Sequence, residues 1–242
     1  MHLEKLQAIA LSSTDYGDSD LIATLFTLER GRLKGFARGA RNSRKRFGPA
    51  LETFARIDLQ LAYKERMSTL KQADIITVYP GIRKNLNRIA HALYACEITE
   101  CFTPEGEPLP RLYRLLTAYL ERLDSGHEGA ADRRFFEINL LNILGYRPSL
   151  DSCSRCGSTF SGGGALMQQE GELLCRLCAP TGRYIEPQVL QGLLACLSTG
   201  RFGLVQLSDD SLLQAGILMD EALATHSGRK LKSLDFLRQM TG

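Results

Sequence analysis

Two pairs of cysteines restrict the local fold of this chain more than any other feature. Cys153 and Cys156 form one C-x-x-C pair, Cys175 and Cys178 form a second, and 18 residues separate the pairs. Each pair lets two thiolates reach one ion from a tight turn, and the intervening residues suffice for a hairpin that brings the pairs together. The spacing therefore predicts a ribbon folded around one tetrahedral Zn²⁺ ion.

Four sulfur ligands leave no coordination position open for water, so the predicted zinc ion is structural. A thioredoxin-like redox pair is a weaker alternative, because two matched pairs that flank a hairpin indicate a shared function. An iron–sulfur cluster also uses four cysteines and stays open. The remaining cysteines fall on apolar helical stretches, where a thiol is expected to pack as a small hydrophobe; they are Cys96, Cys101 and Cys196.

The hydrophobic period changes near Pro80. Before it, breaks rich in Gly, Pro, Ser or Asp separate five strand-length segments, at residues 3–11, 20–28, 31–39, 55–64 and 68–79. Within 55–64, apolar and polar residues alternate, as in a half-buried strand. Five short strands in about 80 residues predict a small Greek-key barrel of the OB type. A generic β-sandwich remains the alternative, since periodicity does not separate the two.

Beyond Pro80 the pattern is helical. One amphipathic stripe is expected to comprise Ile82, Leu86, Ile89, Leu93 and Cys96. Further helices are predicted at residues 111–123, 132–145, 189–197, 211–226 and 231–240, with Asp132 as an N-cap and Gly145 as the residue that ends its helix. The predicted fold class is α+β. Its domains are an OB-fold at 1–80, a helical domain at 81–150 and 183–242, and an inserted zinc ribbon at 151–182.

Positive charge is concentrated in the first third of the chain. Through Pro80 there are 13 Lys plus Arg against 9 Asp plus Glu, whereas the remaining residues have 17 against 18. No acidic residue lies between Glu29 and Glu52, and most of the positive excess falls within residues 30–46. A solubilising loop is the competing interpretation. The single sign over such a length favours a polyanionic partner.

Within residues 31–39, cationic side chains share one strand face with Phe36, and the opposite face carries Leu33 and small residues. The cationic run continues into the following loop. The predicted DNA-binding residues are Arg32, Lys34, Arg38, Arg41, Arg44, Lys45 and Arg46. Phe36 or Phe47 could offer a stacking face for a base, although barrel core is the more frequent place for such rings.

Signatures of catalysis are absent from the sequence. It contains no G-x-x-x-x-G-K-[ST] loop, no H-E-x-x-H and no G-x-S-x-G, and its four histidines are scattered. Asp15, Asp18 and Asp20 could hold a divalent ion, but a strand-connecting turn that uses Asp and Ser side chains is favoured. We therefore expect no enzyme.

The opening MHLEKLQAIALSS has too short an apolar run for a signal peptide, and no segment reaches the roughly 18 apolar residues of a spanning helix. A cytoplasmic protein without a membrane partner is expected. Near the other end, Arg229, Lys230 and Lys232 stand beside apolar residues. This cluster could receive an acidic peptide tail, but an ordinary helix-end group of cations is at least as well supported.

Three segments in fixed order are specific enough to compare with a family: DYGDSDLIATLFTLERGRLKGFARGARNSRKRFGPALE in the basic strand region, GYRPSLDSCSRCG before the second C-x-x-C pair, and RKLKSLDFL near the end. Together with the helical region, they resemble the bacterial recombination mediator RecO family over essentially the whole chain. The resemblance implies an OB-fold followed by a helical domain that a zinc ribbon interrupts. Some family members lack the cysteines. All four are present here, so the resemblance implies a metal ion bound by these cysteines in this chain as well.

The resemblance also implies a non-catalytic activity. Members bind single- and double-stranded DNA and anneal complementary strands. With RecR they load RecA onto DNA covered by single-stranded-DNA-binding protein, in the cytoplasm at the nucleoid. Two other classes stay open from the residues alone: a zinc-ribbon nucleic-acid-binding regulatory factor, and a metal-dependent nucleic-acid enzyme that uses Asp15, Asp18 and Asp20.

Overall fold

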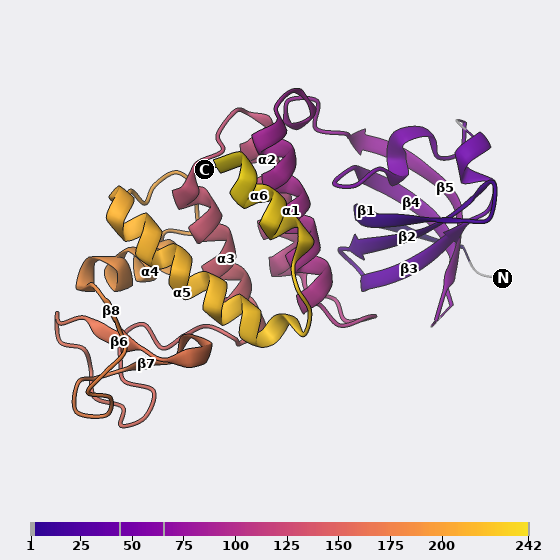
Figure 1. Ribbon diagram of the computed structural model, residues 1–242. Helices are drawn as coiled ribbons and strands as arrows, with labels where there is room; N and C mark the ends of the chain where they lie inside the picture. Colours follow the sequence, from indigo (N-terminus) through magenta and orange to yellow (C-terminus); the bar gives the residue numbers. More distant parts are fainter. Residues whose placement is uncertain (1–2, 44, 65, 242) are drawn as a thin grey trace. The chain divides into compact units, whose positions relative to one another are not determined.

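The computed structural model describes residues 3–43, 45–64 and 66–241, and the chain divides into two compact units. The first unit comprises residues 1–127 and 231–242, and the second comprises residues 128–230. The predicted α+β class is confirmed: an N-terminal five-stranded barrel precedes the helices, and the four-cysteine segment is inserted in the sequence between two helices of the second unit (Figure 1). The four-part domain division stays a prediction.

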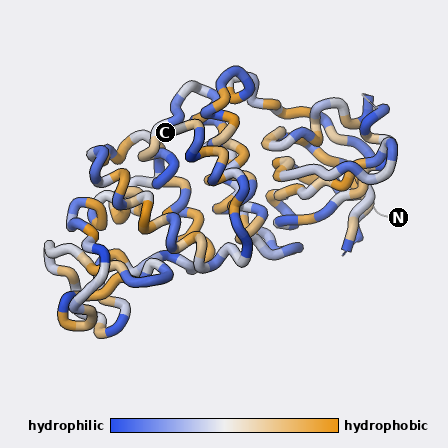
Figure 2. Tube along the Cα trace, in the orientation of Figure 1, coloured by the Kyte–Doolittle hydropathy of each residue, from blue (hydrophilic) through white to orange (hydrophobic). Residues whose placement is uncertain are grey.

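The barrel is closed in the order β1-β2-β3-β5-β4, in which β3 and β5 pair in parallel and the other neighbours are antiparallel. Hydrophilic and hydrophobic residues alternate in short stretches along its strands (Figure 2). The inward set forms one apolar core. The strand bounds are β1 Leu3–Tyr16, β2 Asp20–Thr27, β3 Gly31–Ala37, β4 Arg56–Ala62 and β5 Ser68–Thr77.

Two local features explain the barrel's geometry. At Gly35, a Cβ atom would lie 2.3 Å from Leu70 Cδ2, so only glycine lets β3 approach the core this closely. In β1, the register with β2 shifts between Ala10 and Ser12, which marks a bulge. Pairing with β2 continues beyond the bulge, so β1 extends to Tyr16, five residues past the predicted end at residue 11.

Three helices complete the first unit: α1 Leu86–Phe102, α2 Pro110–Asp124 and α6 Lys232–Thr241. The Asn85 side chain caps α1 by accepting hydrogen bonds from the backbone N–H groups of Asn87 and Arg88. The predicted stripe is wrong at its start, because Ile82 precedes the helix in a 3₁₀ turn and Leu86 is 64% exposed. Strand β1 and helices α2 and α6 all contact α1, so no single stripe describes its buried surface.

The start of α6 is held by a carboxylate from α1. Glu97 accepts hydrogen bonds from the backbone N–H groups of Lys232 and Ser233 and from the Ser233 hydroxyl. A carboxylate at this position satisfies otherwise unpaired amides of the first helical turn. Binding of an acidic peptide tail by Arg229, Lys230 and Lys232 stays a prediction.

The second unit contains helices α3 Ala130–Leu144, α4 Pro187–Thr199 and α5 Asp209–Ser227, and a small sheet of β6 Ala165–Met167, β7 Leu173–Leu174 and β8 Arg183–Ile185. Gly145 ends α3 with φ of 80°, as predicted. Asp132 is not the N-cap, since α3 begins at Ala130 and the Asp132 carboxylate accepts from the backbone N–H of Gly203.

The helical part of the second unit encloses an ionic cluster. Glu137 has no exposed surface, and its two carboxylate oxygens accept hydrogen bonds from Arg133 and Arg134. Arg133 also approaches Asp220 of α5 at 3.4 Å. A buried carboxylate needs such partners, because an unpaired charge in the core is costly.

Candidate metal centre and nucleic-acid interface

The structure brings the four predicted metal ligands together. The sulfur atoms of Cys153, Cys156, Cys175 and Cys178 all lie within 4.8 Å of one another. A tetrahedral ion with sulfur ligands at about 2.3 Å requires sulfurs roughly 3.8 Å apart. The sulfurs of Cys156 and Cys175 are 3.8 Å apart, so the donor set fits a metal ion of this kind.

Two matching backbone turns present these sulfurs. In the first, the N–H of Gly157 donates to the carbonyl of Cys153; in the second, the N–H of Ala179 donates to the carbonyl of Cys175. Gly157 has φ of 71°, a conformation that a glycine adopts at low cost. The Arg155 guanidinium then donates to the Cys178 carbonyl at 2.7 Å and links the two turns.

The pKa values of the thiols differ within the group. Burial opposes ionisation of Cys153, but backbone N–H groups that include those of Cys175 and Cys156 outweigh it and lower the pKa to about 6. The side-chain hydrogen bond with Cys156 is the main cause that raises the pKa of Cys178 to about 12. The four sulfurs cannot all be thiolates at neutral pH unless a positive ion balances their charge.

The other three cysteines do not join this group. Cys96 and Cys196 are buried on helices, and burial raises the pKa of their thiols to about 12 and about 11. Cys101 is partly buried near the end of α1. Cys96 and Cys196 thus pack as small apolar side chains, as predicted.

The cationic strand face is also present. Along β3, Leu33, Gly35 and Ala37 are buried, Lys34 is exposed and Phe36 is half-buried, and Arg38 in the turn directly after the strand is exposed. The register aligns Phe36 with Ile22 of β2 and with Thr69 of β5. This face is therefore the outer surface of β2, β3 and β5.

The two ends of this face differ. At the start of β3, Arg32 donates to the Thr103 carbonyl at 2.8 Å and to the Glu105 carboxylate at 3.3 Å, in the segment between α1 and α2. Lys34 lies 3.8 Å from the same carboxylate. Phe26 of β2 is buried beside Tyr113 of α2. Contacts within the first unit therefore cover the beginning of the face, and its end at Arg38 is open.

The loop after β3 holds the remaining predicted cations. Arg41 pairs with Asp15 at 3.3 Å, and Arg46 donates to the Ser43 hydroxyl and to the Arg38 carbonyl. The side chains of Arg38 and Lys45 are exposed and have no hydrogen-bond or ion-pair partner within the described residues. Arg44 lies outside the described residues. DNA binding by these seven residues stays a prediction.

The two candidate stacking rings lie in different environments, one in the barrel core and one on the outer face. Phe47 is 2% exposed and belongs to the barrel core. Phe36 is half-buried on the outer face, where its ring meets that of Tyr16 edge to face at a centroid distance of 5.7 Å. Core placement was therefore the right expectation for Phe47 and the wrong one for Phe36.

Sequence reasoning missed three residues near this face. Tyr16 lay beyond the predicted end of the first strand. Lys64 and Arg66 are exposed in the loop between β4 and β5, just before the Gly35–Ser68 pair of the parallel ladder. The parallel pairing of β3 and β5 places that loop beside the cationic strand, and no local pattern in the sequence signals such a pairing.

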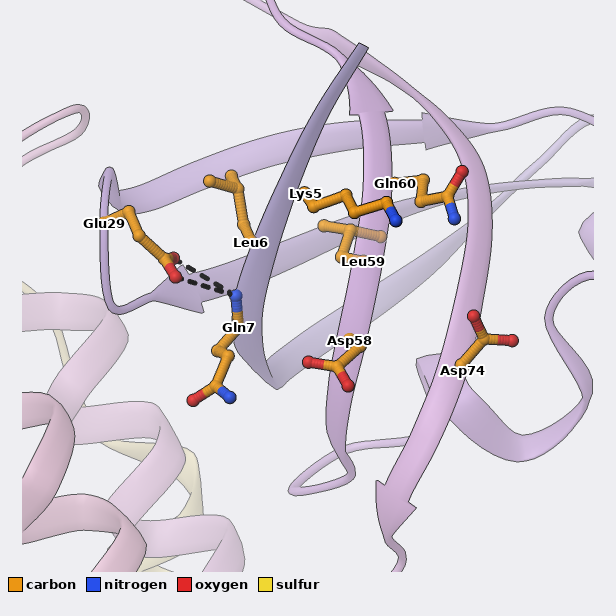
Figure 3. A pocket seen from close by; sticks show the side chains of 8 residues that line it. All are labelled: Lys5, Leu6, Gln7, Glu29, Asp58, Leu59, Gln60 and Asp74. Atoms are coloured by element: carbon orange, nitrogen blue, oxygen red, sulfur yellow. Dashed lines mark hydrogen bonds between the residues drawn. The ribbon is translucent and has the colours of Figure 1, made fainter.

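The barrel surface formed by β1, β4 and β5 has the opposite character. A shallow pocket of about 400 Å³ there is lined by Glu29, Asp58 and Asp74 together with Lys5 and uncharged side chains (Figure 3). The Glu29 carboxylate accepts hydrogen bonds from the backbone N–H of Gln7. Three carboxylates repel phosphate, so this surface does not suit a polyanion.

The acidic trio does not form a metal site. Asp15 pairs with Arg41, Asp20 accepts from the Gly39 N–H at 2.7 Å, and Asp18 lies in the exposed turn between β1 and β2. Among the described residues, the four cysteines are the group of His, Cys, Asp or Glu residues that converges on one point. The enzyme alternative therefore loses its proposed metal ligands.

None of the helices in the described part of the chain combines the length and the hydropathy needed to cross a bilayer.

Comparisons with known proteins match nearly the full length of the chain. A family model described as Recombination protein O N terminal matches residues 1–79, and one described as Recombination protein O C terminal matches residues 83–235. A relative named DNA repair protein RecO from Pelobacter propionicus is 59% identical over 242 residues, which cover 100% of this chain and 98% of that protein. Relatives of the same name from Geobacter sulfurreducens and Myxococcus xanthus are 48% and 37% identical, and cover 100% and 96% of both chains.

Proposed function

The chain belongs to the RecO family of DNA repair proteins, and from this premise we propose that it is a non-catalytic mediator of DNA repair and recombination. It binds single- and double-stranded DNA through the outer face of the barrel and anneals complementary strands. Together with RecR, it loads RecA onto DNA covered by single-stranded-DNA-binding protein. Such a protein works at the nucleoid in the cytoplasm.

One observation supports the DNA site above the others: two exposed cations without partners among the described residues, Arg38 and Lys45, lie at the open end of β3 and in the loop that follows it. Arg41 and Arg46 stand beside them, with their guanidinium groups oriented by hydrogen bonds or an ion pair. Lys64 lies at the other end of the face, where it lines one pocket with Lys34 and Glu105. The carboxylates on the surface of β1, β4 and β5 leave the β3 face as the electrostatically favoured one.

Such an array binds phosphates and reads no base edges, so it accepts any sequence. An annealing protein needs this property, because both complementary strands must bind regardless of their bases. Arg32 contributes least to direct phosphate contact, since Thr103 and Glu105 already occupy its guanidinium. It orients the strand face against the α1–α2 segment.

We propose that Zn²⁺ is the ion held by Cys153, Cys156, Cys175 and Cys178, and that its role is structural. Four sulfur donors prefer zinc among the divalent ions and leave no position for a water molecule. The ion joins two turns that are distant in sequence. The cysteines' own contribution is to present four sulfurs from rigid backbone turns.

The test compares annealing of two complementary strands without ATP by the wild type and by Arg38→Ala/Lys45→Ala. We expect the double variant to bind all sequences more weakly and to anneal more slowly. Its log–log salt slope should fall by roughly 0.7 to 0.9 for each phosphate that the variant no longer neutralises. Lys5→Ala, an exposed cation beside the acidic pocket, is the matched control and should behave as wild type.

Wild-type annealing rates and salt slopes in the double variant would contradict the DNA site. Strong preference of the wild type for one DNA sequence would instead favour a zinc-ribbon regulatory factor.

A further inference from the structure

The outer face of the barrel carries an aromatic pair that the core does not use. Tyr16, the last residue of β1, is 57% exposed, more than Tyr146 at 43% or Tyr184 at 44%. Its ring stands at 88° to the ring of Phe36, with the centroids 5.7 Å apart. Edge-to-face packing of this kind is favourable and restricts the orientation of an exposed ring.

The position of Tyr16 results from the bulge in β1. The register shift between Ala10 and Ser12 changes which residues of the strand point outward. After the shift, Tyr16 pairs with Asp20, which lies two residues before Ile22, the partner of Phe36 on the outer face. The bulge thus places a large ring on the surface beside β3, where a solvent-exposed strand residue would ordinarily be polar.

An exposed cation follows this pair along the chain. Arg38 follows Phe36 by two residues, in the turn directly after β3, and its side chain is exposed. The Arg46 guanidinium donates to the Arg38 carbonyl at 2.8 Å, and Arg41 pairs with Asp15, the residue before Tyr16. The rings therefore lie at the end of β3 from which the proposed phosphate-binding loop begins.

We propose that Tyr16, braced by Phe36, stacks on one unpaired base while Arg38 contacts an adjacent phosphate. This subsite rests on the proposed DNA-binding function and adds to it a preference for single strands over duplex DNA. A base in a duplex is stacked on its neighbours and presents only its edge, whereas a base in a single strand can turn its flat face onto an aromatic ring. The subsite therefore selects single strands before annealing and releases the base when it pairs.

The experiment measures the affinity of Tyr16→Leu for three ligands of equal length: an oligothymidine, a duplex, and a strand with abasic sites throughout its central part. Stacking contributes about 1–3 kcal/mol per base, so the affinity for oligothymidine should fall roughly 5- to 150-fold. The affinity for the duplex and for the abasic strand, and the salt slope with every ligand, should stay at the wild-type values. Tyr16→Phe keeps the aromatic face and should restore binding to oligothymidine.

Phe36→Leu provides a second test, because it removes the brace and leaves the stacking ring in place. We expect a smaller loss with oligothymidine than Tyr16→Leu causes. Thermal unfolding and metal content verify that each variant is folded. Equal losses for oligothymidine and duplex, or no loss in Tyr16→Leu, would overturn the subsite while the phosphate-binding function stands. A wild type that binds none of the three ligands would overturn the proposed function itself.

Discussion

The barrel and the four-cysteine ribbon are both compact, yet different interactions stabilise them. Within the described residues, the barrel core comprises 17 buried apolar side chains contributed by all five strands and the loops between them. Around the cysteines, a small buried cluster comprises Cys153, Leu174 and Ala179, with Phe160, Cys175 and Cys178 partly buried against it, and the short strands of the ribbon add a few more buried side chains. Burial of apolar surface can stabilise the first region alone, at about 25 cal/mol per Å². The second has too little of it.

This difference shows how each region can change. A barrel with its own core tolerates variation of its outer face, so cations and rings can be placed there for binding. The ribbon instead brings its four cysteines to one point, where the proposed ion would join two turns of the chain. Mutations in the ribbon should therefore change zinc content and leave DNA binding nearly unchanged, and mutations in the barrel should do the reverse.

The largest expected effect comes from Cys153→Ser. The substitution removes a ligand whose sulfur lies within 4.8 Å of the other three. Structural zinc supplies on the order of 10 kcal/mol of folding free energy in small zinc domains, so the ribbon should lose its ion and its order. Metal analysis should give one zinc per chain for the wild type and close to none for the variant, whereas DNA binding by the barrel should stay within a few-fold of wild type.

Clearly less than one zinc in the wild type, or full retention of zinc in Cys153→Ser, would contradict a structural zinc site. Cys196→Ser is the matched control, because Cys196 is buried on α4 away from the cluster and should leave the metal content unchanged.

The reciprocal change is Gly35→Ala in the barrel. The added Cβ would lie 2.3 Å from Leu70 Cδ2 and 2.7 Å from Leu70 Cγ, inside a packed core. Overpacking of this kind costs about 1–3 kcal/mol. Chemical denaturation should show this loss for the transition that reports on the barrel, together with weaker DNA binding. Zinc content should not change; a joint loss of zinc would mean that the two regions fold as one.

The extent to which the sequence predicts this molecule follows from the range of the interactions involved. Local patterns were sufficient for the cysteine cluster and for the alternation along β3, since two-residue periodicity and cysteine spacing depend on near neighbours. They failed at Leu86, because the surroundings of α1 are set by elements distant in sequence. Aspartate is a residue type common at N-caps, but the Asp132 carboxylate instead accepts a hydrogen bond from the backbone N–H of Gly203, 71 residues away.

The candidate DNA face shows the same division. The cations of β3 and its loop were evident from charge alone. Tyr16 was not, because a bulge earlier in the same strand determines which way it points. Lys64 and Arg66 join the face only through the parallel pairing of β3 with β5. The neutralisation of Arg32 depends on Glu105, which lies in the segment between two helices.

The smallest expected effect tests that neutralisation. Glu105 is 42% exposed, pairs with Arg32 at 3.3 Å and lies 3.8 Å from Lys34. Exposed ion pairs contribute about 0–1 kcal/mol, so Glu105→Gln should leave the stability of the barrel nearly unchanged. It removes one negative charge beside two cations of the strand face, and each cation then becomes more available to a phosphate. Affinity for DNA should rise about two- to five-fold at low salt, and the log–log salt slope should steepen by up to roughly 0.7 to 0.9 for each additional phosphate that is neutralised. The two cations should not contribute equally to this increase in affinity. Because the Arg32 side chain is 17% exposed and also donates to the Thr103 carbonyl, most of the increase should come through Lys34. Lys34→Ala in the Glu105→Gln background should cancel it. An increase that survives this second substitution would assign the effect to Arg32 and extend the open end of the face to the whole strand.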